Sequence, residues 1–129
     1  MKDQWMDLHV HTWYSDGVLS PRKVVEKAGR AGLKAVGISD HDTIAGVEEA
    51  RQRGKKMGVT VVPGVELSSQ YKGRDVHILG YCFDETHPAL LNYLEKFQQE
   101  RFNRAEKMVR NLNRIGIDIS MKEVEERAR

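Results

Sequence analysis

The chain has 129 residues, of which 40% are hydrophobic and 31% are charged, and this balance excludes a wholly disordered protein. Its net charge is only +2, from 21 Lys and Arg residues against 19 Asp and Glu residues, so the sequence gives no strong nucleic-acid signal. No apolar run approaches the roughly 18 residues that a membrane-spanning helix needs, so we expect one domain, or part of one, without membrane contact.

The start of the chain and its cysteine content favour the cytoplasm. The residues from Met1 to Trp5 lack the apolar core and the small-residue cleavage site of a secretory signal. Cys82 is the only cysteine, so neither an intrachain disulfide nor a zinc knuckle is available. We expect Cys82 to be a small buried residue on a strand, and we expect the protein to be cytoplasmic.

The first half of the chain alternates short strands with helices. A strand is predicted at residues 5–11, followed by a loop and by a helix that begins at Ser20-Pro21 and ends at Gly32. A second apolar strand at residues 35–39 leads into a helix over residues 43–57. This repeat of strand and helix is typical of an α/β fold with parallel strands.

Two further strands and two helices are expected after this repeat. Residues 59–66 are β-branched and almost wholly apolar, which suits a strand buried on both faces of a parallel sheet. Residues 67–71 and 75–83 flank Lys72-Gly73-Arg74 and predict a hairpin. A long helix should run from Pro88 to Gly116. Its apolar stripe consists of Leu94, Phe97, Ala105, Met108, Leu112 and Ile115.

The spacing of Ser120 and Glu123 is that of a capping box, which opens a helix running to Arg129 without a stop signal. We therefore divide the chain into residues 1–83, the strand-rich segment, and residues 84–129, a helical segment that ends within an element. This ending favours a truncated chain.

Metal-ligand side chains follow the predicted strands at their C-terminal ends. His9 and His11 point the same way from one strand, His41 and Glu66 follow the next two, and His77 lies on the hairpin. A single histidine at a strand end is more often hydrogen-bonded or exposed than a ligand. Because the C-terminal ends of parallel strands gather at one edge of a sheet, the joint pattern predicts a metal centre. The ligand set is too large for one tetrahedral ion.

Four motifs resemble, in order, the opening motifs of the PHP family, named for polymerase and histidinol phosphatase. They are Asp7-Leu8-His9-Val10-His11-Thr12 with Tyr14-Ser15-Asp16-Gly17, then Ser39-Asp40-His41-Asp42-Thr43, then Pro63-Gly64-Val65-Glu66, then Val76-His77-Ile78-Leu79-Gly80-Tyr81. The match over residues 5–83 is most similar to the stand-alone phosphoesterases, including the nucleoside bisphosphate phosphatase group. It implies the N-terminal part of a distorted (βα)7 TIM-like barrel, an α/β fold, followed by a helical insertion.

The resemblance also implies two or three divalent ions, Mn²⁺, Zn²⁺ or Fe²⁺, at the C-terminal ends of the strands. The resemblance implies that His9, His11 and Glu66 hold the first ion. It implies that Asp16 and His41 contribute to a second ion, and that Glu66 bridges to a third ion, which His77 also binds. The implied activity is hydrolysis of phosphate monoesters of small phosphorylated molecules, with nucleotides as candidates, by metal-activated water and without a protein nucleophile.

Two further pairs of residues have alternative interpretations. In the first interpretation, either Asp40 or Asp42 accepts a hydrogen bond from an imidazole ligand and orients it. In the second interpretation, both are helix-capping carboxylates before Thr43. Arg101 and Arg104, one turn apart on the long helix, either bind a substrate phosphate or belong to a solvated charged face.

The family pattern continues with a further His and a final Asp-x-His, and no histidine follows His87 in this chain. The chain is therefore either the N-terminal portion of a phosphoesterase or a catalytically incomplete metal-binding or interaction module. Three strand-helix units and a hairpin cannot close a barrel, so the open sheet edge could also receive a complementing chain or a second copy.

Overall fold

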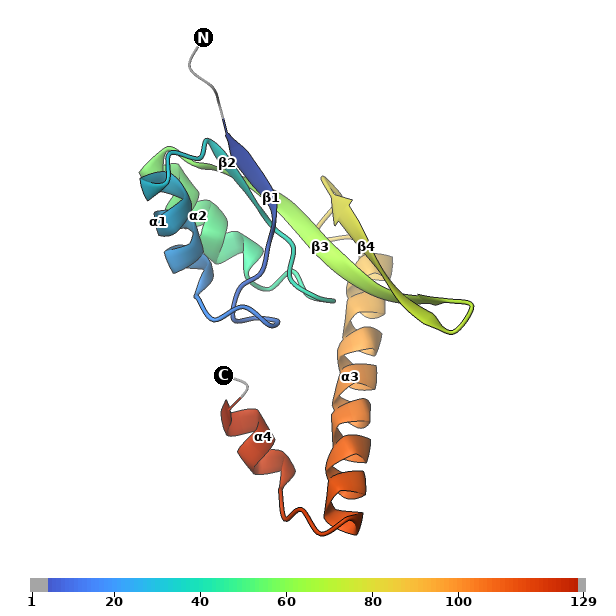
Figure 1. Cartoon of the computed structure of the whole chain (residues 1–129). Helices are drawn as coiled ribbons and strands as arrows, with labels where there is room; N and C mark the ends of the chain where they lie inside the picture. The colour runs from blue at the N-terminus through green and yellow to red at the C-terminus, as the bar shows by residue number, and fades with distance from the viewer. Residues whose placement is uncertain (1–4, 128–129) are drawn as a thin grey trace. The chain divides into compact units, whose positions relative to one another are not determined.

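The computed structural model describes residues 5–127, which form four strands and four helices (Figure 1). Expectations about residues 1–4 and 128–129 lie outside this range. The elements are β1 (Met6–Val10), α1 (Pro21–Arg30), β2 (Ala35–Ile38), α2 (Val47–Met57), β3 (Thr60–Tyr71), β4 (Arg74–Tyr81), α3 (Pro88–Arg114) and α4 (Met121–Arg127). The chain divides into two compact units between Leu91 and Asn92, and the predicted division after residue 83 stays a prediction.

The four strands of the described chain form one sheet in the order β1-β2-β3-β4. The pairs β1-β2 and β2-β3 are parallel, and β4 returns antiparallel to β3. The α/β class with parallel strands and a hairpin is therefore confirmed. One expectation was wrong, because the predicted strands 59–66 and 67–71 are a single strand: Thr60–Pro63 pairs with β2, and the register with β4 continues without a break from Gly64.

The core of the first unit lies between the sheet and the helices α1 and α2. α1 contributes Val24 and Val25, β2 contributes Val36 and Ile38, and α2 contributes Val47, all of them buried. Burying such a side chain stabilises the fold by about 1.5–3 kcal/mol. The predicted N-cap of α1 is confirmed, since the Ser20 side chain accepts a hydrogen bond from the Lys23 amide at 3.3 Å.

The beginning of α2 and the position of Cys82 correct two expectations. α2 begins at Val47 and not at Thr43, because Asp42 has a left-handed φ of 52° and the Thr43 hydroxyl accepts a bond from the Ala45 amide. Cys82 is exposed rather than buried on a strand. It follows the last residue of β4 and has a φ of 56°, so the chain turns out of the sheet there.

The sheet of the first unit is strongly curled. The Tyr81 hydroxyl at the end of β4 donates a hydrogen bond to the Leu8 carbonyl of β1 at 2.8 Å. Three strand spacings in a flat sheet would separate these strands by about 14 Å, so only a curled sheet allows this contact. A Cβ atom on Gly64 would lie 3.0 Å from the Tyr81 ring, and glycine at this position therefore leaves room for the ring.

The second unit contains most of α3 and all of α4. The predicted end of α3 is confirmed by Gly116, which has a φ of 88°. The predicted capping box is confirmed by reciprocal hydrogen bonds between Ser120 and Glu123, at 2.8 Å to 3.3 Å. The predicted apolar stripe is partly wrong, because Met108 is 56% exposed and its neighbour Val109 is buried. No helix within residues 5–127 has the length and apolar character required to span a membrane.

Candidate metal centre

Four segments of the first unit bring the six predicted ligands together. His9 belongs to β1, and His11 and Asp16 follow it in the next loop. His41 comes after β2, Glu66 lies on β3 and His77 on β4. The ligand atoms form three groups, within each of which all distances are at most 4.8 Å: His9, His11 and Glu66; His11, Asp16 and His41; and His41, Glu66 and His77.

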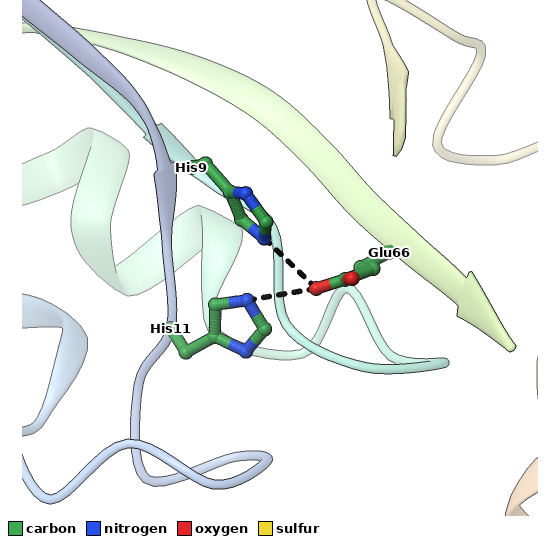
Figure 2. A group of neighbouring side chains, drawn as sticks. All are labelled: His9, His11 and Glu66. Carbon is green, nitrogen blue, oxygen red and sulfur yellow. Dashed lines mark hydrogen bonds and ion pairs between the residues drawn. The ribbon is translucent and has the colours of Figure 1, made fainter. Parts of the chain in front are cut away.

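The first group joins the end of β1 to the middle of β3. Figure 2 shows the imidazoles of His9 and His11 both pointing at the carboxylate of Glu66. Nε2 of His9 and Nε2 of His11 each lie 2.9 Å from Oε2 of Glu66. The two histidines reach one oxygen because alternate side chains of an extended chain project to the same side.

The second group depends on the tight loop after β1. Nδ1 of His11 lies 2.7 Å from Oδ1 of Asp16, and Nε2 of His41 lies 3.7 Å from Oδ2 of Asp16. The Gly17 amide donates to the Thr12 carbonyl at 3.0 Å, and a Cβ atom on Gly17 would collide with the carbonyl of His11. Glycine therefore lets the loop fold back until Asp16 meets His11.

The third group joins β3, β4 and the segment after β2. Nδ1 of His77 lies 2.9 Å from Oε1 of Glu66, and Nδ1 of His41 lies 3.7 Å from Oε2 of Glu66. In the β3-β4 register Ser68 is opposite His77, so His77 is a diagonal neighbour of Glu66 on the ladder. Diagonal neighbours are within reach of side chains as long as these.

The candidate ligands differ widely in the exposed fraction of their side chains. The side chain of Glu66 is only 7% exposed and that of His41 12%, whereas that of Asp16 is 66% exposed. Burial raises the pKa of Glu66. The hydrogen bond from His9 and the charges of the nearby histidines together lower this pKa by more than burial raises it, so the net shift is downward. The pKa of Asp16 is also lowered, because its contacts with His11 and His41 outweigh burial. Both groups are thus ionised at neutral pH.

The donor set fits divalent transition metals. His11, His41 and Glu66 each belong to two of the three groups. Of these three, the Glu66 carboxylate could bridge neighbouring ions through its two oxygens, whereas a neutral imidazole has one lone pair and could bind one ion at a time. Imidazole nitrogens mixed with carboxylate oxygens suit Zn²⁺, Mn²⁺ or Fe²⁺ better than Ca²⁺, which prefers oxygen throughout. The first group has the same members as the first ligand combination expected from the resemblance, whereas the second group also contains His11 and the third also contains His41. Metal binding by these residues stays a prediction.

The remaining predicted residues lie in two places. Asp40 and Asp42 flank His41, and their hydrogen bonds join them to residues of the β1 loop and of β3. Arg101 and Arg104 lie on α3 in the second unit, and their contact with a substrate phosphate stays a prediction.

Sequence reasoning missed Thr12, Ser15 and Ser68, whose hydroxyl groups bond to Asp40 or Asp42. A local signal was present for the first two, since Thr12 directly follows His11 and Ser15 directly precedes Asp16. No comparable signal linked Ser68 to Asp42, because their contact depends on the pairing of distant segments.

Residues 7–125 of the chain match the PHP domain. The chain belongs to the PHP domain family. It is 41% identical over 111 residues to a 5'-3' exoribonuclease of Haemophilus influenzae, an alignment that covers 86% of this chain and 40% of that protein. It is 34% identical over 112 residues to a 3',5'-nucleoside bisphosphate phosphatase of Chromobacterium violaceum, covering 87% and 39% of the two chains.

Solved structures confirm the fold of this PHP domain. A structure from Bifidobacterium adolescentis, named as a metal-dependent phosphoesterase, superposes with a TM-score of 0.91 at 31% identity and covers 98% of this chain. An amidohydrolase structure from Chromobacterium violaceum gives a TM-score of 0.83 at 33% identity over 88% of this chain. The chain spans 44% and 40% of the lengths of these two proteins.

Proposed function

We propose that this PHP domain supplies the metal centre of a metal-dependent phosphoesterase. The observation that carries the proposal is the overlap of the three ligand groups at Glu66, His11 and His41. A carboxylate that belongs to two groups, as Glu66 does, would hold neighbouring ions close together, which suits an in-line displacement at phosphorus. The named activities of relatives support the same reaction class, since they include a phosphatase and a phosphodiesterase as well as an exoribonuclease.

The exposure of the candidate ligands indicates which of them would hold metal and which would face the substrate. When bound, two or three Mn²⁺, Zn²⁺ or Fe²⁺ ions would supply an activated water and positive charge for the phosphate oxygens. Glu66, which is buried and ionised, would hold ions on the protein side of the centre. Asp16 is the most exposed of the candidate ligands, so a phosphate ester would approach from its side. No Ser or Cys nucleophile is needed for this chemistry.

Phosphate esters of nucleotides are the proposed substrate class. Two relatives named above act on nucleic acid or nucleotides by their names, and a third is a phosphoribosyl 1,2-cyclic phosphate 1,2-diphosphodiesterase of Eggerthella lenta. All of these molecules carry a phosphate on a ribose. The even charge balance of this chain favours a small nucleotide over a long polynucleotide.

Hydrolysis assays with Mn²⁺ test both the reaction and the substrate class. The substrates are p-nitrophenyl phosphate, bis-p-nitrophenyl phosphate, adenosine 3',5'-bisphosphate and a 5'-phosphorylated oligoribonucleotide. Turnover of the bisphosphate that is lost with EDTA and restored by Mn²⁺ supports the proposal. Metal binding without turnover of any of the four would instead favour the alternative, a metal-binding module that is catalytically incomplete.

We also propose that the protein works in the cytoplasm. Its only cysteine, Cys82, is exposed and can form no disulfide within the chain, which suits a reducing compartment. Small phosphorylated substrates are abundant there. Fractionation of cells that express the tagged protein tests this location, and enrichment in a membrane or secreted fraction would contradict it.

Contact with a second polypeptide is proposed at the edges of the sheet. Among the described residues β1 and β4 are the outer strands, and Met6 and Leu8 of β1 are 56% and 37% exposed. Unpaired backbone groups and exposed apolar side chains of this kind favour pairing with another strand. Sedimentation analysis of the chain tests the proposal, which predicts a species larger than the monomer.

A further inference from the structure

Two buried carboxylates lie on either side of the candidate ligand His41. Asp40 is 1% exposed and Asp42 is 0% exposed. The Glu66 amide donates to the Asp40 carbonyl at 3.1 Å and the Asp42 amide donates to the Glu66 carbonyl at 3.0 Å, so residues 40–42 run alongside β3. Carboxylates this deeply buried are tolerated only when their oxygens accept hydrogen bonds, so the identity of the donors is informative.

The donors to Asp40 belong to the loop that carries two candidate ligands. Oδ1 of Asp40 accepts hydrogen bonds from the Thr12 amide and from the Ser15 hydroxyl, both at 2.6 Å. Oδ2 accepts from the Thr12 hydroxyl at 2.7 Å. Thr12 directly follows His11 and Ser15 directly precedes Asp16, so one carboxylate fixes the loop at both ends of the turn that brings these ligands together.

The donors to Asp42 belong to the hairpin. Oδ1 accepts from the Ser68 amide and Oδ2 from the Ser68 hydroxyl, both at 2.7 Å. Ser68 is opposite His77 in the β3-β4 register and lies two residues from Glu66. Asp42 has a φ of 52°, a left-handed conformation that aspartate tolerates better than most residues, and this turn aims its carboxylate at Ser68.

We propose that Asp40 and Asp42 form a carboxylate clamp that positions the candidate ligands around His41 without binding metal. The inference rests on the proposed metal-dependent function. Asp40 holds the segment of His11 and Asp16, and Asp42 holds the hairpin. Each ligand group takes atoms from separate segments, so its geometry depends on contacts that fix these segments to one another. The clamp makes these contacts through buried, charge-assisted hydrogen bonds, which are the stronger kind.

Variants of the hydroxyl partners test the clamp while leaving every candidate ligand and both carboxylates in place. Thr12→Val and Ser68→Ala each remove one hydroxyl donor in the full chain. We expect each to raise the Kd for Mn²⁺ about 10-fold or more in calorimetric titrations, the range typical when a contact that orients metal ligands is lost. The circular dichroism spectrum should stay that of the wild type.

Ser20→Ala is the matched control, because the Ser20 hydroxyl is also a partly buried hydroxyl of the first unit, and it accepts the N-cap hydrogen bond from the Lys23 amide rather than donating to Asp40 or Asp42. It should lower Tm by loss of the N-cap and leave the Kd for Mn²⁺ unchanged. If Thr12→Val and Ser68→Ala behave like this control, with a lower Tm and an unchanged Kd, the clamp is merely structural and the inference is overturned.

Asp42 offers a rescue experiment. Asp42→Gly suits the left-handed backbone but lacks the carboxylate, and Asp42→Asn keeps an oxygen for the Ser68 amide and tolerates the same φ. We expect weak Mn²⁺ binding with Gly and recovery of most of the affinity with Asn. Equal affinity of the Gly variant and the wild type would overturn the inference.

Failure of the clamp can be told from failure of the proposed function. Wild-type protein that binds Mn²⁺ but hydrolyses no ester contradicts the function, while the Kd values of the variants still judge the clamp. Wild-type protein that binds no Mn²⁺ contradicts both.

Discussion

His9 and Glu66 are 57 positions apart in the chain, and Nε2 of the imidazole lies 2.9 Å from Oε2 of the carboxylate. The contact joins β1 to β3 across the intervening β2. Because Nε2 of His11 also lies 2.9 Å from the same oxygen, a single carboxylate contacts both histidines of the opening motif.

Replacement of His9 and His11 together by alanine should abolish uptake of Mn²⁺. The pair provides two of the three ligand atoms of the first group, and His11 also belongs to the second. Metal content measured by atomic emission after loading and desalting checks this. His87→Ala is the matched control, because His87 is an exposed histidine outside the three groups and should leave the stoichiometry unchanged. Unchanged metal content in the double variant would show that the pair is structural.

Glu66→Gln should weaken Mn²⁺ binding more than Asp16→Asn does. Glu66 belongs to two ligand groups and is 6% exposed, whereas Asp16 belongs to one group and lies at the solvent side. We expect Glu66→Gln to raise the Kd by about 100-fold or more, beyond the usual loss for an outer contact. Calorimetric titration of both variants measures the difference. The reverse order of affinities would contradict a bridging role for Glu66.

Gly37→Ala should destabilise the first unit by about 1–3 kcal/mol, the usual cost of overpacking. A Cβ atom at this position would collide with the backbone of Leu8 on β1, where neither strand can yield without breaking the sheet. Urea denaturation measures the free energy of unfolding. The control is Gly29→Ala in α1, whose Cβ would meet only the side chains of Met57 and Val59, so a small change is expected. Equal stability of the Gly37 variant and wild type would contradict the close approach of β1 and β2.

The capping box of α4 should be lost in acid. The pKa of Glu123 lies below its ordinary value of 4.5, because it accepts hydrogen bonds from the side chain and the backbone of Ser120. A lowered folded-state pKa means that the cap stabilises α4 above the unfolded pKa and is lost as pH falls through the folded pKa. The protection factor of the Ser120 amide, which is its intrinsic exchange rate at each pH divided by the rate measured by NMR, should fall between pH 6 and about pH 3. Glu123→Gln should remove this pH dependence of the protection factor.

Much of the local structure followed from short-range patterns. The N-cap at Ser20, the end of α3 at Gly116 and the box of Ser120 and Glu123 were predictable, because each depends on residues within one helical turn. The start of α2 was not, because the left-handed turn at Asp42 is fixed by Ser68 on another strand. The exposure of Cys82 likewise depends on where β4 leaves its partner strand.

The sequence by itself determined the types and order of the candidate ligands and the family, because imidazoles and carboxylates at strand ends are visible in the chain without any fold. Only the tertiary structure decided which ligands share an oxygen. It also decided that Asp40 and Asp42 bond to Thr12, Ser15 and Ser68. The physical reason is that strand pairing and sheet curl bring residues that are distant in the sequence within hydrogen-bonding distance. The spacing of residues along the sequence does not predict those distances.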